Sequence, residues 1–198
     1  MIIGVCGLIG SGKGTVADLL VERHGFAKVS FADSLKDCVA AVFGWPRELL
    51  EGDTEESRRW REQVDGWWAD RLGMPKLTPR WALQYWGTEV CRNGFHNDIW
   101  VASLENRMRA SGRSYVIPDT RFPNEINAIR SLRGSVWHVT RGENPAWFDA
   151  FVRDGIEPTD VHESEWRWAR GGFDRVIRND GTLAELGEIV EECLRAEG

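Results

Sequence analysis

The sequence lacks several features that would assign it to common protein classes. Its four cysteines form no Cys-x-x-Cys pair and its four histidines form no cluster at metal-ligand spacing, so we expect reduced thiols and no structural zinc. It contains no leader-like segment and no apolar run near the roughly 18 residues that a membrane-spanning helix needs. From these absences we expect a cytoplasmic protein that does not enter a membrane.

Positively charged residues are also fewer than negatively charged ones. The 198 residues include 25 Lys and Arg against 31 Asp and Glu, for a formal net charge of -6. Because such a surface repels polyanions, we expect no nucleic acid polymer as a partner, and any phosphate site must be a local cluster of Arg and Lys. The 11 Trp are many. Since Trp60, Trp67 and Trp68 fall at helix-like spacing, we expect core or interface packing for them, not stacking on single strands.

One motif dominates the N-terminal region. Residues 7–15 read Gly-Leu-Ile-Gly-Ser-Gly-Lys-Gly-Thr, between an apolar run at 2–6 and an amphipathic segment. This spacing is typical of a phosphate-binding loop, in which glycines allow close approach to an anion and the Lys reaches the outer phosphates of a nucleoside triphosphate. A Gly-rich turn without a ligand is the alternative, which the Lys, the Thr and the strand-helix context disfavour. The residues expected to hold the donor phosphates are Gly10, Ser11, Gly12, Lys13, Gly14 and Thr15.

The place of Thr15 narrows the class of protein. Gly14 occupies the position where the loop motif usually has Ser or Thr, and Thr15 follows it. The resulting Gly-Lys-Gly-Thr is similar to the loop of small-molecule kinases of the adenylate kinase type. It therefore favours such kinases over switch GTPases.

Strand-like and helix-like segments alternate along the chain. Strands are predicted at 27–32, 113–118, 135–140 and 174–177, and helices from 33, at 81–90, 99–108 and 124–132, and at 182–195 with Thr182 and Glu185 as a capping box. Asp33 or Ser34 is the expected N-cap of the helix that begins near 33. The alternation predicts an α/β fold, a P-loop NTPase three-layer sandwich with a central parallel sheet. Its ligands should lie beyond the C-terminal ends of the strands.

Two stretches interrupt this alternation. Residues 44–76 carry an acidic-basic run and a Trp pair, which predicts a mostly helical insertion that covers an acceptor, or more simply a solvated helix with ion pairs. Residues 142–172 look irregular, and a loop of that length is usually functional or mobile, which would suit a lid over the donor nucleotide. We therefore divide a single domain into a core at 1–43 and 77–198, an insertion at about 44–76 and a lid-like segment at about 142–172.

Further candidate residues are spread along the chain. Arg80, Gln84 and Thr88 share one face of a predicted helix, and Lys36 lies close to the expected ligand edge of the sheet, although it reads equally well as a solvated Lys. Asp119 follows an apolar strand, where the carboxylate that organises a metal belongs in a phosphate-loop protein. A helix-capping role for this Asp is the alternative.

The motifs in their order resemble those of the deoxynucleoside monophosphate kinases of T-even and related bacteriophages. The residues that carry the resemblance are the loop at 7–15, Lys36, Arg80 with Leu83-Gln-x-x-Gly-Thr88, Asn93-x-Phe95 with Trp100, Ile117-Pro-Asp-Thr-Arg121 with Glu125, Val136-x-His-Val-x-Arg141, His162-x-x-Glu165 and Asn179-Asp-Gly-Thr-Leu-x-Glu-Leu186. The resemblance implies an adenylate kinase-like fold. It also implies transfer of the γ-phosphoryl group of ATP to a 5′-deoxynucleoside monophosphate with Mg²⁺, for DNA precursor synthesis.

The resemblance also implies a role for each matching residue. The catalytic residues would be Lys13, Arg80, Asp119 and Arg121, and the metal residues Thr15 and Asp119, partly through water. The acceptor would be bound by Lys36, Arg80, Gln84, Thr88, Arg121 and Glu125, the donor phosphates also by Arg141, and Glu165 would belong to the lid. The family suggests a homodimer, small nucleotides as the ligands, and the host cytoplasm if a phage encodes the chain.

The chemistry of phosphoryl transfer requires the same residue types. Its transition state is loose, so catalysis consists of positioning and cationic neutralisation and needs no nucleophilic side chain. The insertion is shorter and richer in Trp than in the T-even form, and 142–172 is longer, which leaves the accepted base open. A kinase of another small acceptor, such as a ribonucleoside monophosphate or dephospho-coenzyme A, is an alternative. A nucleotide-binding module without turnover is another, which the cations of Arg80 and Arg121 beside Asp119 disfavour.

Overall fold

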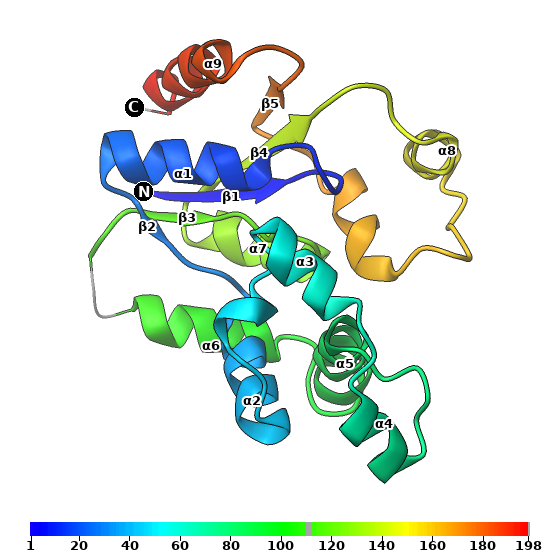
Figure 1. The fold of residues 1–198 in the computed structure, drawn as a ribbon. Coiled ribbons are helices and arrows are strands. Elements are labelled where there is room, and N and C mark those ends of the chain that lie inside the picture. The colour runs from blue at the N-terminus through cyan, green and yellow to red at the C-terminus, as the bar shows by residue number, and fades with distance from the viewer. Residues whose placement is uncertain (110–111, 198) are drawn as a thin grey trace. The chain divides into compact units, whose positions relative to one another are not determined.

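The computed structural model describes residues 1–109 and 112–197 (Figure 1). Within these ranges the strands form one parallel sheet in the order β2-β3-β1-β4-β5. The strands are β1 (Ile2–Cys6), β2 (Ala27–Lys28), β3 (Tyr115–Ile117), β4 (Ser135–Thr140) and β5 (Arg175–Arg178). The central place of β1 puts the loop that follows it between the ends of β3 and β4.

The described chain separates into two compact units. The first unit comprises Met1–Ser30 and Met108–Gly198, and the second comprises Phe31–Arg107. Besides the sheet, the first unit contains α1 (Lys13–His24), α7 (Pro123–Ser131), α8 (Ala146–Asp154), η3 (Glu163–Glu165), η4 (Arg167–Arg170) and α9 (Leu183–Arg195). The second unit consists of α2 (Asp33–Phe43), η1 (Glu48–Leu50), α3 (Glu55–Arg61), α4 (Gly66–Leu72), α5 (Pro79–Tyr85), η2 (Trp86–Asn93) and α6 (Ile99–Met108).

Helices cover both faces of the sheet in the first unit. Successive side chains of a strand point to opposite faces. Ile3 and Val5 of β1 are buried in a core that α1 and α9 close, whereas a Cβ at Gly4 would lie 2.3 Å from Cδ1 of Ile129 on α7. Figure 1 shows α1 and α9 on one side of the sheet and α7 on the other. This arrangement confirms the expected three-layer sandwich around a parallel sheet.

Aromatic packing organises the second unit. The ring of Phe43 stacks on Trp45 with centroids 4.2 Å apart, and Trp68 meets it edge-on at 5.0 Å. The indole N–H of Trp68 also donates to the backbone oxygen of Phe43 over 3.0 Å. Trp68 therefore packs as expected, whereas Trp67, for which packing was also expected, is 65% exposed. Residues 44–76 contain η1, α3 and α4, in line with the predicted helical character of this segment.

Three predicted elements differ from those in the structure. The helix from 33 has Ala32 at its N-cap position and no side-chain cap, because the carboxylate of Asp33 instead pairs with Arg47 and Arg107 at 3.7 and 3.4 Å. The strand predicted at 27–32 is reduced to Ala27–Lys28. The segment 142–172 is less irregular than predicted, since it contains α8, η3 and η4, with Phe148 and Phe151 of α8 buried.

Two findings bear on the absences in the sequence. None of the helices in residues 1–109 or 112–197 has the length and apolar character to cross a membrane. The cysteines at 6, 38, 91 and 193 are all free thiols, as expected from their spacing. The sulfur of Cys6 is buried, and this burial raises the pKa of its thiol above the ordinary value.

The cap of α9 makes a testable contribution to stability. Thr182 Oγ1 accepts the Glu185 backbone N–H over 3.3 Å, and Glu185 Oε2 accepts the Thr182 N–H over 2.7 Å, which is the predicted capping box. We expect Thr182→Ala to lower the free energy of unfolding by about 1 kcal/mol, while Thr182→Ser retains the cap. Urea denaturation measures the free energy of unfolding of both variants. Equal stabilities of the Ala and Ser variants would contradict the prediction.

Candidate active site

The loop between β1 and α1 adopts backbone angles that suit glycine. Gly10 and Gly12 have φ values of 81° and 100°, in the left-handed region that other residues rarely adopt. Gly12 is the N-cap of α1 and supplies no side-chain hydrogen bond to the first turn of the helix. The N–H groups at this end therefore need another acceptor, and the positive end of the helix dipole favours an anion.

A buried hydroxyl group in the loop supports the same interpretation. Ser11 is 2% exposed, and within the described residues its Oγ makes no hydrogen bond. Buried hydroxyl groups normally have a partner, because burial without one costs free energy. Gly14 and Thr15, in the first turn of α1, are exposed. The loop is therefore built to receive a polar ligand, and a polyphosphate fits its open amide groups.

The ammonium group of Lys13 points back into the loop. Its Nζ donates to the backbone oxygens of Gly7 and Leu8 over 2.7 and 2.8 Å. Burial, followed by the nearby positive charge of Arg121, lowers the pKa of Lys13 to about 8. A neighbouring anion would reverse this effect, because it would stabilise the charged ammonium.

Parallel strands bring two further candidates to the same edge of the sheet. Asp119 and Arg121 follow β3, whose C-terminal end lies beside that of β1. Ser30 Oγ donates to Asp119 Oδ2 over 2.5 Å, and Arg121 Nη1 pairs with Glu165 Oε1 over 2.9 Å. The Arg121 side chain is 40% exposed while that of Glu165 is 14% exposed. Glu165 is therefore the less exposed partner of this ion pair.

Glu125 lies beneath this edge instead of on its surface. It is 2% exposed, and its Oε2 accepts the backbone N–H groups of Arg121 and Phe122 over 2.6 and 3.0 Å. The carboxylate therefore fixes the backbone from which the Arg121 side chain extends. Contact between Glu125 and an acceptor stays a prediction, and its observed partners indicate a positioning role.

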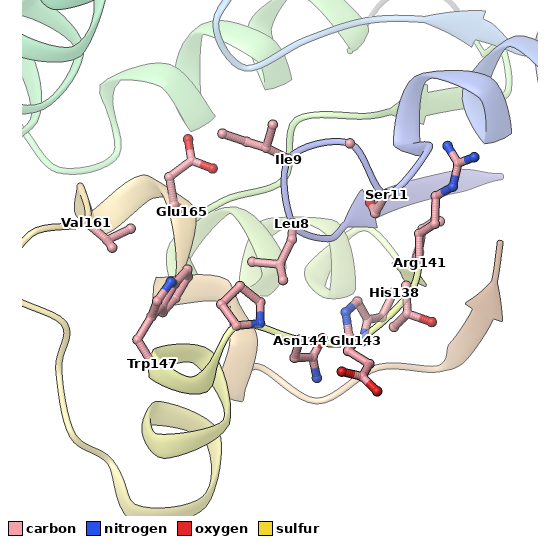
Figure 2. Close-up of a pocket in the computed structure, with 14 residues that line it drawn as sticks. Leu8, Ile9, Ser11, His138, Arg141, Glu143, Asn144, Trp147, Val161 and Glu165 are labelled. Atoms are coloured by element: carbon pink, nitrogen blue, oxygen red, sulfur yellow. The ribbon is translucent and has the colours of Figure 1, made fainter. Parts of the chain in front are cut away.

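A cavity of about 300 Å³ adjoins the loop (Figure 2). Figure 2 shows Leu8 and Ile9 of the loop on one side, and Trp147 and Val161 from 142–172 on the other. Its lining residues are Leu8, Ile9, Gly10, Ser11, His138, Val139, Thr140, Arg141, Glu143, Asn144, Pro145, Trp147, Val161 and Glu165. Of these residues, the sequence had indicated Arg141 and Glu165 as candidates. It had not indicated Asn144 or Trp147, for which the only clue to a role in the site was their position in a long segment that follows a strand.

His138 faces this cavity as a neutral side chain. Its ring packs 5.1 Å from Trp168 and 4.6 Å from Phe173, measured between centroids. Burial first, and the charge of Lys13 second, lower its pKa to about 4. The ring therefore packs against aromatic side chains beside the cavity.

The lowered pKa predicts a pH-dependent contribution of His138 to stability. The unfolded chain binds a proton at His138 below about pH 6.5, whereas the folded chain resists it until about pH 4. Stability should therefore fall as pH decreases from 6.5 to 4, and His138→Phe should flatten that slope. Thermal unfolding from pH 7 to 4.5 compares the two proteins, with His96→Phe as a control because His96 is exposed. A slope unchanged in His138→Phe would contradict the assignment.

The remaining candidates belong to the second unit. Lys36 Nζ pairs with Glu51 Oε2 over 2.5 Å and its side chain is 12% exposed, while Arg80 Nη1 pairs with Glu62 Oε1 over 3.1 Å. Thr88 is buried at 4% exposure. The predicted helix 81–90 is in fact α5 followed by the π-helical η2, which begins at Trp86. The wider π turn changes the angular spacing before Thr88, so Arg80, Gln84 and Thr88 do not follow a regular α-helical face.

Comparisons with known proteins agree with the geometry of the loop. A family model described as deoxynucleotide monophosphate kinase matches residues 74–190. A protein of Acanthamoeba polyphaga mimivirus whose name includes the same activity is 31% identical over 209 residues, covering 98% of this chain and 96% of that protein. The deoxynucleotide monophosphate kinase of Enterobacteria phage T4 is 22% identical, with 98% of each chain covered.

A solved structure supports the fold. TT1252 from Thermus thermophilus superimposes with a TM-score of 0.52 at 20% identity, covering 100% of this chain and 97% of that chain. The comparisons confirm the resemblance drawn from the motifs, and with it the expected kinase class. The full-length alignment and the family model show that this chain belongs to the deoxynucleotide monophosphate kinase family.

Proposed function

We propose that this protein transfers the γ-phosphoryl group of ATP to the 5′-phosphate of a deoxynucleoside monophosphate, giving ADP and a deoxynucleoside diphosphate. The observation that carries the proposal is the phosphate loop with Lys13, which shares one sheet edge with Arg121 in a member of this kinase family. Because the amides of the first turn of α1 have no side-chain cap, they are available to the donor phosphates.

Each donor-side residue has a distinct task. The loop amides from Gly10 to Thr15 bind the phosphate oxygens, and Lys13 exchanges its two backbone acceptors for the outer phosphates. Arg121 leaves Glu165 to neutralise the transferred phosphoryl group. Arg141 follows β4 and lines the cavity beside the loop, which supports a role for this cation in binding the donor.

Magnesium fits this site with few protein ligands. The described residues contain no group of three or more His, Cys, Asp or Glu suited to a metal ion. Mg²⁺ usually keeps several waters and binds one or two protein groups together with substrate phosphates. Thr15 and Asp119 would supply those protein groups, partly through water, and the bound ion would neutralise phosphate charge.

The second unit carries further candidates for binding the acceptor. Lys36 and Arg80 each pair with a carboxylate, Glu51 and Glu62 respectively, and an acceptor phosphate would replace these anionic partners. Gln84 and Thr88 are the candidates for contacts with the base or sugar. No general base is required, because the acceptor phosphate oxygens are already ionised near neutral pH. Positioning and charge neutralisation supply the catalysis.

The remaining elements of the proposal concern partners and location. The ligands are small nucleotides and not nucleic acid polymers, since the net charge of -6 repels a polyanion. The reading as a homodimer rests on the family resemblance alone. Because the named relatives are encoded by a virus and a phage, the proposed place of action is the cytoplasm of an infected cell.

Release of ADP from ATP and Mg²⁺ with every deoxy and ribo monophosphate tests this function. We expect turnover with one or a few deoxynucleoside monophosphates, and the identity of these substrates shows which base is accepted. Equal use of ribo and deoxy substrates would overturn the deoxy preference. Tight ATP binding without turnover on any monophosphate would favour another acceptor, such as dephospho-coenzyme A, or a module without catalysis.

A further inference from the structure

The turn after β5 contacts the phosphate loop directly. Asn179 Nδ2 donates to the backbone oxygen of Ser11 over 2.9 Å, across 168 residues of sequence. A Cβ on Gly12 would lie 2.2 Å from the same nitrogen, so the Asn179 carboxamide packs against the loop at its glycine. Contact this close restricts both the position and the orientation of the loop backbone.

The same turn also contacts the end of β4 and the beginning of segment 142–172. The Asn179 backbone N–H donates to Thr140 O over 2.8 Å, at the end of β4. Asp180 Oδ1 accepts the Gly142 backbone N–H over 2.6 Å. Asn179 therefore holds the phosphate loop and Asp180 holds the beginning of segment 142–172, and neither side chain carries a positive charge that could bind phosphate.

The hydrogen bond at Ser11 has a direct consequence for anion binding. In a trans peptide the carbonyl oxygen and the following N–H point in opposite directions. When Asn179 fixes the Ser11 carbonyl, it also directs the Gly12 N–H away from the turn. Gly12 could otherwise rotate with little restraint, because glycine populates many backbone conformations.

We propose that Asn179 is a positioning residue for the donor nucleotide, which sets the peptide between Ser11 and Gly12 in the orientation that binds phosphate. Asp180 fixes the same turn to Gly142, so that the turn holds the phosphate loop and the first residues of segment 142–172 in a fixed relative position. The inference rests on the proposed function for its link to catalysis, but the effect on nucleotide binding is independent of turnover.

Equilibrium binding of ATP and of ADP to Asn179→Ala tests the proposal. We expect each dissociation constant to rise about tenfold, as for loss of one well-placed hydrogen bond and the order it imposes. The KM for ATP should rise in parallel, while the KM for the deoxynucleoside monophosphate and the unfolding midpoint stay near wild type. Asn127→Ala, on the exposed face of α7, is the matched control and should change none of these quantities.

A second variant keeps the test decisive if Asn179→Ala does not fold. Asn179→Asp has nearly the same volume but offers the Ser11 oxygen a carboxylate in place of an N–H donor, so its nucleotide affinity should fall at least as far. Unchanged affinity in a folded variant, or a loss that tracks only a lower unfolding midpoint, would overturn the positioning role. Wild-type protein that binds ATP but phosphorylates no monophosphate would overturn the proposed function alone.

Discussion

Replacing Arg121 with Ala should reduce kcat for phosphoryl transfer by a factor of about 10³, by analogy with arginines that stabilise the charge of this transition state. Arg121 lies at the loop edge after β3, where its guanidinium group pairs with Glu165 over 2.9 Å. Its backbone N–H remains bound to buried Glu125, so the variant should keep its fold.

The measurement is kcat for ADP release at saturating ATP, Mg²⁺ and the preferred monophosphate. Arg195→Ala, exposed on α9, serves as the charge-matched control and should retain full activity. Arg121→Lys should recover only part of the loss, because an ammonium group cannot reproduce the two parallel hydrogen bonds of a guanidinium group. A loss below tenfold in Arg121→Ala would remove this residue from the catalytic set.

Lys13→Ala should lower kcat/KM for ATP by about 10² to 10³, the range measured when one preorganised donor to a developing charge is removed. In the free protein Lys13 Nζ donates to Gly7 O and Leu8 O, and these oxygens lose their partner in the variant. Nucleotide binding and turnover should therefore both suffer. Lys28→Ala, which removes an exposed ion pair with Asp18, is the control and should leave kcat/KM unchanged.

The pH dependence of ATP binding separates the charge of Lys13 from its size. Its pKa in the free protein is about 8, below the ordinary 10.5, and phosphate binding favours the protonated form. ATP binding should therefore take up a proton above pH 8. The dissociation constant should rise with pH from 8 to 9.5, by at most tenfold per pH unit. Lys13→Ala should lack this slope, and a wild-type dissociation constant independent of pH would contradict the assignment.

The phosphate loop and the fold were predictable because their determinants are local. The spacing from Gly7 to Thr15 specifies a strand-loop-helix unit without reference to the rest of the chain. The rule that parallel strands present their C-terminal ends at one edge then places Asp119 and Arg121 beside the loop. The observed pairing of β1 with β3 confirms this geometry.

Other features depend on contacts that no local pattern encodes. Asp is a common N-cap residue, but the carboxylate of Asp33 pairs with Arg47 and Arg107 instead. The Trp147 wall of the cavity is formed by α8 within a segment whose sequence looks irregular. The π-helical turn at Trp86 has no counterpart in the α-helical periodicity of 81–90. For Asp33, ion pairs with residues distant in the sequence therefore override a local preference.

The strand order also governs when the surroundings of the phosphate loop can form during synthesis. The loop follows β1, which lies between β3 and β4, and these strands begin only at Tyr115 and Ser135. Pairing across such sequence separations is slow and must wait for the later strands. A nascent chain in which β4 has not been made therefore lacks one neighbour of β1, and the sheet edge around the loop is incomplete. Cellular nucleotide would then stabilise chains whose central sheet is complete more than chains that lack β4.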